Sequence, residues 1–410
     1  MRAGAPAAIV TVGTELVTGL RTDTNGPEIA RLLSQRGFRV ERLTSVPDDE
    51  ERIRDLVREL LTAHALVVVT GGLGPTHDDV TREAVAGALG RRLVRDPALV
   101  RDLKARIPAG ADPAALAARA RQADVIEGAR VVPATTGTAP GQVIVVGTST
   151  VVLLPGPPHE MRPMLDAFVD GSPSGVPPVR LRCAGITESQ AALVLTPALE
   201  PFCEITLTLL ASPGEVEVIL FAAPGDDSTV RLRAAGAAAR TALGRACYTQ
   251  GGESLAETVL QLARERGQRL ALAESCTGGR VAAELTAVPG ASEVLVGGVV
   301  AYADETKETL LGVPHRMLEE YGAVSEPVAR AMAAGALELP GADIAVAITG
   351  IAGPGGGSAE KPVGLVWLCC ARRDGALCTE RHVFAGQRPT VTRRATVAAL
   401  DLLRRVLAEA

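Results

Sequence analysis

Three short apolar runs in this sequence pass directly into glycine turns that open helical patterns. They are "AAIVTVG" from Ala7, "ALVVVTGG" from Ala65 and "ALAESCTGG" from Ala271. Strands that alternate with helices in this way form parallel sheets, because each helix carries the chain back to the edge at which the strand began. The fold class that we expect is α/β, with two α/β domains whose sheets are largely parallel.

Two stretches rich in glycine and serine divide the chain. "GSPSGVPP" (Gly171–Pro178) is a linker by composition, and "CYTQGGES" (Cys247–Ser254) marks a second boundary. The segment between them follows an α+β pattern rather than strict alternation. We therefore expect an N-terminal domain over residues 1–170, a small α+β domain over 171–250 and a C-terminal domain over 251–410.

The charge and the cysteine content exclude several classes of protein. A formal net charge of −5 is not the excess of basic residues that is typical of nucleic-acid-binding proteins. No apolar run approaches the roughly 18 residues that a membrane span needs. Seven cysteines without a C-x-x-C pair indicate reduced thiols rather than a zinc site or a disulfide framework. The N-terminal apolar stretch is short and interrupted by glycine, so we expect no signal peptide and a cytoplasmic protein.

The turn in "ALAESCTGG" places a serine, a cysteine and a threonine in succession. In a doubly wound sheet, ligands bind at this end of the strands. Gly278 and Gly279 allow backbone N–H groups to face an oxyanion or a phosphate. Ser275 and Cys276 are then candidate nucleophiles. The competing interpretation is that Ser275 or Thr277 simply caps the following helix.

Two further stretches of the same domain supply polar groups at strand ends. "VVAYADETK" carries Tyr302 and Lys307, and the glycine loop of "TGIAGPGGGSAEK" ends at Lys361. A serine nucleophile needs a base, and the histidines of this domain lie outside these loops. A neutral lysine can serve instead, so Lys307 is the candidate base and Tyr302 would relay or orient the proton. The alternatives are a surface lysine and a half-buried tyrosine at a strand end.

The stretch "VVVTGGLGPTHDDVTREA" is the N-terminal counterpart of this strand, turn and helix. It lacks the G-K-[ST] of a P-loop and a complete G-x-G-x-x-G, so neither nucleotide-binding fingerprint applies. Asp78 and Asp79 are either favourable acids in a first helical turn or carboxylates that hold a divalent metal beside a phosphate cradle. Further candidate ligands or orienting groups are Glu15, Asp23, Asn25 and Glu160.

The C-terminal stretches resemble the CinA (competence/damage-inducible protein A) family. The likeness is carried by "AESCTGG", "GGVVAYADETKETLLGV", "GAVSEPVARAMAAGAL" and "TGIAGPGGGSAEKPVGLVWL". This domain is similar to bacterial nicotinamide mononucleotide amidases. The resemblance therefore implies hydrolysis of nicotinamide mononucleotide to nicotinate mononucleotide and ammonia, in NAD salvage and without a cofactor.

The same resemblance assigns roles to individual residues of this sequence. It makes Ser275 the nucleophile and gives Tyr302 and Lys307 the assisting roles, while Cys276 becomes a packed neighbour. The substrate-binding residues that it implies are Thr277, Gly278, Gly279, Gly353, Gly355, Gly356, Lys361, Arg388 and Arg393.

The N-terminal stretches "TVGTELVTG", "TDTN", "LPGPPHEMRPM" and "TTGTAPG" resemble the molybdopterin-binding fold of the MoaB/MogA type. In the CinA branch this resemblance implies a metal-dependent ADP-ribose pyrophosphatase. The metal would be Mg, Mn, Co or Ni, and potassium is a further candidate ion. His77 stands where the family more often has proline. The implied metal ligands are Asp78, Asp79 and Glu15, and the implied substrate-binding residues are Gly71, Gly72, Gly74 and Thr76.

The middle segment resembles the KH-type domain of CinA proteins, but it contains no G-x-x-G, so we do not expect it to bind nucleic acid. The expected partners are small molecules and a second copy of the chain in a homodimer. Two other functions stay open. One is a molybdopterin-type cofactor-binding protein, on the N-terminal fold alone. The other is a non-enzymatic competence or DNA-repair adaptor, which would have no need of Ser275, Tyr302 and Lys307.

Overall fold

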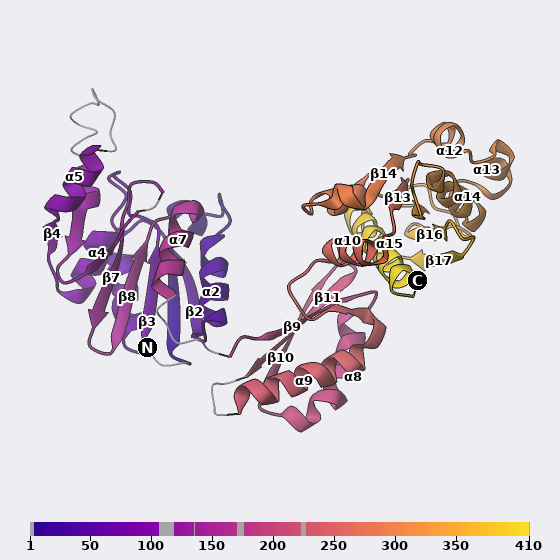
Figure 1. Ribbon diagram of the computed structural model, residues 1–410. Coiled ribbons are helices and arrows are strands. Elements are labelled where there is room, and N and C mark those ends of the chain that lie inside the picture. The colour runs from indigo at the N-terminus through magenta and orange to yellow at the C-terminus, as the bar shows by residue number, and fades with distance from the viewer. Residues whose placement is uncertain (1–3, 106–118, 135, 170–175, 223–226, 410) are drawn as a thin grey trace. The chain divides into compact units, whose positions relative to one another are not determined.

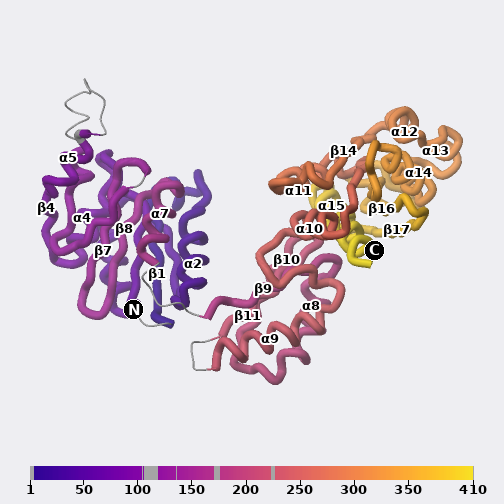
Figure 2. Tube along the Cα trace, viewed as in Figure 1, coloured from indigo at the N-terminus to yellow at the C-terminus, as the bar shows by residue number. Residues whose placement is uncertain are grey.

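The contacts of the computed structural model divide the chain into two compact units. The first holds Met1–Pro178 and Ala222–Thr229, and the second holds Val179–Phe221 and Val230–Ala410. Figure 1 labels their elements, and Figure 2 traces the same chain from the indigo N-terminus to the yellow C-terminus. The structure describes residues 4–105, 119–134, 136–169, 176–222 and 227–409. Over these ranges, no helix has the length and the apolar content that are needed to cross a membrane.

A six-stranded sheet forms the centre of the first unit. Its strands are β1 (Pro6–Val12), β2 (Arg39–Val46), β3 (Leu66–Thr70), β6 (Arg130–Val132), β7 (Gly141–Val146) and β8 (Ser149–Leu154). They lie in the order β2-β1-β3-β8-β7-β6. The pairs β1–β2, β1–β3 and β3–β8 are parallel. β7 and β6 add antiparallel pairs, because a short turn rather than a crossover helix joins β7 to β8.

Helices cover both faces of this sheet. They are α2 (Asn25–Gln35), α3 (Glu50–Leu61), α4 (Thr81–Leu89) and α7 (Pro158–Val169). Ala8 and Val10 of β1 pack in one core with α3 and α4, whereas Ala7 and Ile9 pack in the other with α2 and α7. The strand is a continuous apolar run because alternate residues face two cores. The shorter elements are α1 (Thr14–Val17), β4 (Leu93–Arg95), α5 (Pro97–Ala105), η1 (Arg121–Ala123) and β5 (Asp124–Ile126).

The second unit begins with a four-stranded antiparallel sheet. Its elements are β9 (Val179–Ala184), α8 (Glu188–Leu199), η2 (Glu200–Phe202), β10 (Ile205–Ser212), β11 (Glu215–Ala222), α9 (Ser228–Leu243), η3 (Gly244–Ala246) and β12 (Cys247–Thr249). The strands lie in the order β10-β11-β9-β12, and β9 pairs antiparallel with both β11 and β12. Thr187 and Gln190 form a capping box that fixes the start of α8.

A five-stranded mixed sheet forms the rest of this unit. Its elements are α10 (Leu255–Arg266), β13 (Leu270–Glu274), α11 (Arg280–Thr286), η4 (Ala291–Glu293), β14 (Leu295–Val300), α12 (Asp304–Leu311), α13 (His315–Tyr321), α14 (Glu326–Leu337), β15 (Ile344–Gly350), β16 (Leu365–Arg372), β17 (Leu377–Val383) and α15 (Arg388–Glu409). The order is β14-β13-β15-β16-β17. The first three strands are parallel, and β16 and β17 are antiparallel because a glycine loop without a helix joins β15 to β16.

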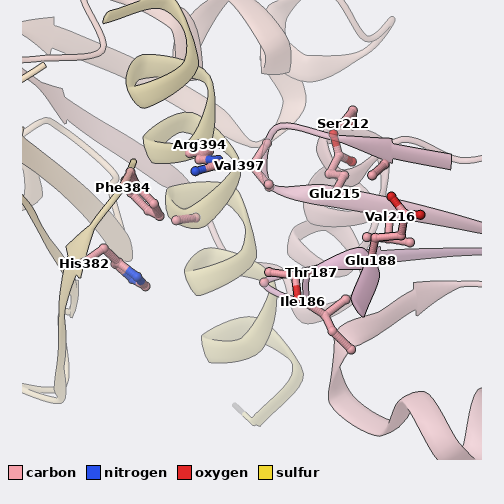
Figure 3. Close-up of a pocket in the computed structure, with 14 residues that line it drawn as sticks. Ile186, Thr187, Glu188, Ser212, Glu215, Val216, His382, Phe384, Arg394 and Val397 are labelled. Carbon is pink, nitrogen blue, oxygen red and sulfur yellow. The ribbon is translucent and has the colours of Figure 1, made fainter. Parts of the chain in front are cut away.

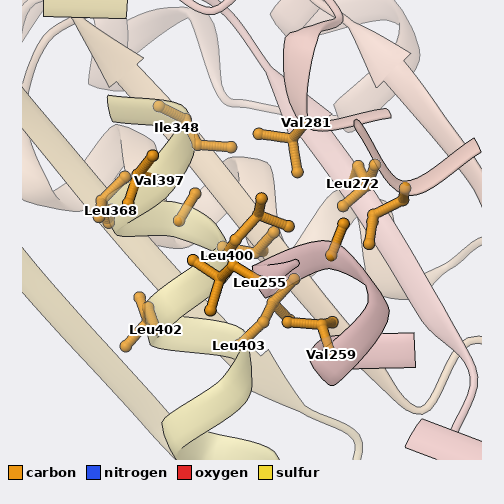
Figure 4. Close-up of a cluster of buried hydrophobic side chains, with 14 of the residues drawn as sticks. Leu255, Val259, Leu272, Val281, Ile348, Leu368, Val397, Leu400, Leu402 and Leu403 are labelled. Atoms are coloured by element: carbon orange, nitrogen blue, oxygen red, sulfur yellow. The ribbon is translucent and has the colours of Figure 1, made fainter. Parts of the chain in front are cut away.

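Alternate residues of β13 feed the two cores of this second sheet. Figure 4 shows Leu400 and Leu403 of α15 beside Leu255 of α10, and Leu272 of β13 belongs to the same core. The neighbouring residue Ala271 belongs to the opposite core, which contains the buried face of α14. With both faces covered, the edge of the sheet where β13, β14 and β15 end is the place for a ligand.

The packing of α14 against α12 gives a test of this fold. A Cβ at Gly335 would lie 2.0 Å from the carbonyl oxygen of Leu311, so Gly335→Ala should destabilise the second unit by about 1–3 kcal/mol or more. A Cβ at Gly87 of α4 would lie 3.5 Å from the nearest atom, Cδ of Arg54. Gly87→Ala should therefore stabilise the first unit by roughly 0.5–1 kcal/mol, because alanine favours the helix. Urea unfolding of both variants measures the two changes in the free energy of unfolding, which should have opposite signs. A Gly335→Ala variant as stable as the wild type would contradict the close packing of α14 on α12.

Candidate functional site

Three loops of the second unit leave the sheet at the same edge, and those after β13 and β14 start level with one another. Glu274, the last residue of β13, pairs with Val300 of β14 on one side and with Ile348 of β15 on the other. The N–H of Ala301 donates to the carbonyl of Glu274 over 2.7 Å, and the N–H of Ser275 donates to the carbonyl of Ile348 over 2.9 Å. The loops that carry the predicted nucleophile and base therefore leave the sheet side by side.

The buried carboxylate of Glu274 holds the turn that contains Ser275. It accepts hydrogen bonds from the N–H groups of Gly279, Val281 and Ala282 at 3.0, 3.1 and 2.8 Å. These are orphan donors at the start of α11, so Glu274 is the cap of this helix. Sequence reasoning missed this role, although an acidic residue that ends a fully apolar strand was its visible signal.

This cap changes what the turn offers to a ligand. The Gly279 N–H is bound by Glu274, and the Gly278 N–H donates to the carbonyl of Ser275 over 3.0 Å. In this structure the N–H groups of Gly278 and Gly279 are therefore both engaged within the protein. Neither Ser275 nor Thr277 caps α11, so the simple capping interpretation is wrong.

Thr277 presents the turn's unsatisfied polar atom. Its side chain is 2% exposed, and its hydroxyl oxygen has no hydrogen-bond partner in the described structure. Buried polar groups are nearly always paired, so an orphan hydroxyl beside Ser275 is a place for a ligand atom.

Cys276 is a packed thiol rather than a nucleophile. Burial raises its pKa to about 12, and the nearby cations of Arg388 and Lys307 only partly oppose this shift. A Cβ on Gly350 at the end of β15 would lie 3.0 Å from its sulfur, which shows how closely the two loops approach. Because the thiolate is the reactive form of cysteine, this raised pKa disfavours Cys276 as a nucleophile.

Lys307 lies almost wholly inside the protein, which excludes the interpretation of a surface lysine. Its side chain is 2% exposed, and its ammonium donates to Oδ1 of Asp304 over 2.9 Å. It also reaches the carbonyl oxygen of Tyr302 at 3.5 Å. Asp304 was not among the sequence-predicted residues, although its position three residues before Lys307 on α12 was a usable signal.

Tyr302 and Arg388 connect the other two loops. The tyrosine is exposed, and its hydroxyl oxygen accepts a hydrogen bond from Nη1 of Arg388 at 3.0 Å. Nε of Arg388 donates to the carbonyl of Gly353 in the glycine loop over 2.7 Å. Arg388 thus joins the start of α15 to the loops after β14 and β15. Gly355 and Gly356 are exposed in that glycine loop, and a Cβ on Gly355 would meet no atom within 4 Å.

Two predicted substrate-binding cations are engaged elsewhere in this structure. The guanidinium of Arg393 contacts the carboxylates of Glu284 and, at 3.1 Å, Glu215 of β11. The ammonium of Lys361 donates to the carbonyl of Tyr321 at the end of α13. Both side chains would have to exchange these partners before they could bind a phosphate.

A cavity of about 670 Å³ lies at the ends of β1 and β3 in the first unit. Its carboxylates are Glu15, Asp23, Asp48, Asp78 and Asp79, and its wall also contains Arg21, Asn25, Gly71, Gly72, Gly156 and His159. All three implied metal ligands therefore line one cavity, together with the further candidates Asp23 and Asn25. Glu160 lies instead over Gly137, where an added Cβ would be 2.1 Å from its carboxylate.

The glycine turn in this cavity is held by Asp79 rather than left open. The carboxylate of Asp79 accepts hydrogen bonds from the N–H groups of Gly74 and Thr76, both at 2.8 Å, and from the Thr76 hydroxyl. The buried guanidinium of Arg82 donates to the carbonyls of Leu73 and Gly74. Gly71, with φ of 101°, passes so close to Val12 that a Cβ would lie 2.3 Å from its carbonyl oxygen.

The residues of this cavity do not form a ready-made metal cage. Among the described residues, no group of three or more His, Cys, Asp or Glu side chains is placed to hold an ion. Asp78 and Glu15 are exposed, and Asp79 is already bound to the turn. Mg²⁺ usually takes one or two carboxylates together with the phosphates of its substrate, and the acidic wall fits that mode. Oδ1 of Asn25, buried and unpaired in the described structure, is an additional free acceptor.

A second cavity, of about 310 Å³, lies between the β10–β11 hairpin and α15 (Figure 3). Its wall includes His382 and Phe384, whose rings stack with centroids 5.0 Å apart, and Val397 of α15. None of Ser275, Tyr302 and Lys307 lines this cavity, so it is separate from the loops after β13 and β14.

Comparison with known proteins finds two families along the chain. Residues 252–407 match the CinA C-terminal domain, and residues 8–174 match a probable molybdopterin binding domain. The chain is 42% identical to a putative competence-damage inducible protein of Symbiobacterium thermophilum, over 98% of each chain. It is 40% identical to a CinA-like protein of Mycobacterium marinum, over the whole of both.

Solved structures give partial matches. A competence/damage inducible protein from Agrobacterium tumefaciens is 41% identical, with a TM-score of 0.37 over 38% of this chain and 93% of that one. A competence damage-inducible protein A from Klebsiella pneumoniae is 42% identical, with a TM-score of 0.36 over 38% of this chain and 98% of that one.

The raised pKa of Cys276 predicts that this thiol resists alkylation at neutral pH. Its thiolate should form only as the pH approaches about 12, so iodoacetamide should leave it unmodified in the folded protein. Cys203 is exposed and serves as the labelled control. Peptide mass spectrometry measures both sites in one sample. Labelling of Cys276 as fast as that of Cys203 would contradict the burial of this thiol.

Proposed function

The chain belongs to the CinA family, and on this premise we propose that its C-terminal site hydrolyses nicotinamide mononucleotide to nicotinate mononucleotide and ammonia. The observation that carries the proposal is the placement of Lys307. Its side chain is buried beside the carboxylate of Asp304 on helix α12, and the loop that leads into α12 starts level with Ser275. An ordinary lysine is exposed on the surface, whereas a serine nucleophile needs a base nearby, and the neutral form of a buried lysine can serve as one.

In the proposed reaction, Oγ of Ser275 attacks the carbon of the substrate carboxamide. Neutral Lys307 accepts the hydroxyl proton, and Asp304, 2.9 Å from its nitrogen, stabilises the ammonium that results. Lys307 then returns the proton to the amide nitrogen as the C–N bond breaks, and ammonia leaves. Water adds to the resulting ester, Lys307 takes a proton from it, and nicotinate mononucleotide is released as Ser275 recovers its hydrogen.

The other residues of the site would bind and orient the substrate. The orphan hydroxyl of Thr277 is a donor for the carboxamide oxygen, where negative charge develops. Arg388 has a guanidinium for the substrate phosphate, and its bond to the Tyr302 hydroxyl links phosphate binding to the loop that leads into α12, the helix of Lys307. The exposed glycines Gly355 and Gly356 allow close approach of the loop backbone to the ligand.

For the first unit we propose a metal-dependent ADP-ribose pyrophosphatase in the cavity at the ends of β1 and β3. A volume of about 670 Å³ and an acidic wall support this assignment. Asp78 and Glu15 would hold a divalent metal together with the pyrophosphate, and the metal would neutralise charge on that group. Asp79 and Arg82 keep the turn of Gly71, Gly72 and Gly74 in shape around the substrate. A molybdopterin-type ligand in the same cavity is the competing assignment.

Replacement of the nucleophile separates the two neighbouring candidates. Ser275→Ala should abolish the release of ammonia from nicotinamide mononucleotide, since loss of a serine nucleophile costs up to about 10⁶-fold in rate. Cys276→Ala should retain most of the activity and lose on the order of 1 kcal/mol of stability, because a buried thiol is truncated. Steady-state ammonia release with product mass spectrometry measures both. Activity that survives in Ser275→Ala and disappears in Cys276→Ala would overturn the assignment.

The first-unit activity is tested by Asp79→Ala. Removal of this carboxylate frees three donors in the turn that faces the cavity, so cleavage of ADP-ribose in the presence of Mg²⁺ or Mn²⁺ should fall by at least about 10²-fold. Hydrolysis of nicotinamide mononucleotide by the same sample reports whether the second unit is folded, and urea unfolding reports whether the first unit is. If the wild-type protein binds molybdopterin but leaves ADP-ribose intact with every metal, the pyrophosphatase assignment is wrong and the competing one stands.

A further inference from the structure

Two cysteines of the second unit face each other across a pair of strands. Cys247 of β12 and Cys183 of β9 are direct partners in the antiparallel register. Direct partners have Cα atoms about 4.5–5.5 Å apart and point to the same face of the sheet. Disulfides join Cα atoms about 4.4–6.8 Å apart, so a directly paired position is within the range for a bridge, and the register shift of this strand pair lies after Cys247, on the side of Thr249.

The two thiols also affect one another electrostatically. The pKa of Cys183 is raised by Cys247 and by burial, the pKa of Cys247 is lowered by Cys183, and neither cysteine is in a disulfide. Cys183 is fully buried, whereas Cys247 is partly exposed on a three-residue strand at the edge of its sheet. One member of the pair is therefore accessible from solvent, and the other lies directly behind it.

We propose that Cys183 and Cys247 form a reversible disulfide when the protein meets a hydroperoxide, so that this strand pair is an oxidation site. The electrostatic surroundings of Cys247 support the proposal. The neighbouring thiol of Cys183 lowers the pKa of Cys247 to about 7, and the cations of Arg240 on α9 and Arg404 on α15 act in the same direction. A thiolate at neutral pH is the form that attacks peroxides.

The chemistry proceeds in two balanced steps. The thiolate of Cys247 attacks one peroxide oxygen, the O–O bond breaks, and the departing alkoxide or hydroxide takes up a proton. Cys247 is now a sulfenic acid. The sulfur of Cys183 then attacks the sulfur of Cys247, the S–O bond breaks, and hydroxide leaves with the proton of Cys183 as water. The two thiols lose two electrons, which reduce the hydroperoxide. An added dithiol can then reduce the disulfide back to the two thiols by thiol–disulfide exchange.

The site lies next to contacts that reach the C-terminal sheet. Tyr248, the residue after Cys247, donates its hydroxyl to Oε1 of Glu215, and the other oxygen of Glu215 binds Arg393 at 3.1 Å. Arg404 of α15 donates to the carbonyl of Arg245 just before β12. A bond between Cys183 and Cys247 would fix β12 to β9 next to these hydrogen bonds. The proposal does not depend on which reaction the C-terminal site performs.

The test is treatment of the full-length protein with hydrogen peroxide, followed by blocking of free thiols and non-reducing digestion. Mass spectrometry should find the Cys183 and Cys247 peptides linked, with the loss of two hydrogen atoms, and dithiothreitol should restore both. In Cys183→Ser, Cys247 should proceed to sulfinic acid or to a mixed disulfide, because its resolving partner is absent.

Cys203 gives the matched control, since it is exposed and lies between η2 and β10, outside the strands. Cys203→Ser should leave the yield of the Cys183–Cys247 link unchanged. Recovery of both peptides unlinked while Cys203 is oxidised would overturn the proposal. A link that forms only between two copies of the chain through Cys203 would overturn it as well.

Discussion

Glu274 connects the parts of the C-terminal site through its hydrogen bonds. Its backbone carbonyl accepts the N–H of Ala301 in the loop after β14, and its carboxylate accepts three N–H groups from the turn and helix that follow Ser275. A buried carboxylate is expensive unless it is fully hydrogen-bonded, and the helix start supplies those bonds and a favourable dipole. The position of Ser275 therefore follows from one residue that joins a strand, a helix and the neighbouring loop.

The first unit uses the same device at its own glycine turn. Asp79 accepts three hydrogen bonds from the turn, as Glu274 does in the second unit, and the buried Arg82 secures the carbonyls on the other side. In both places an acidic residue at a strand-to-helix turn shapes the backbone. The turn N–H groups that these carboxylates bind are not free for a ligand. The side-chain oxygens of Asn25 and Thr277, which have no partner in the described structure, are free.

Local patterns in the sequence predicted the sheets, because a strand buried on both faces is a continuous apolar run whatever lies around it. The position of Lys307 after a strand was equally local. The contact between Arg388 and Tyr302 joins residues 86 positions apart, and neither segment contains a pattern that predicts it. Nor could the sequence tell that Glu215 and Glu284 hold Arg393, since only the folded chain brings these groups together.

The account of the C-terminal site depends on a covalent bond between Ser275 and the substrate. The most direct measurement is the mass of the Ser275 peptide from protein that is quenched in acid during turnover of nicotinamide mononucleotide. The account predicts an ester of nicotinate mononucleotide on that peptide, formed as ammonia is released and lost as the substrate is consumed. Ammonia release with an unmodified Ser275 peptide at every quench time, from the first turnover onward, would contradict it.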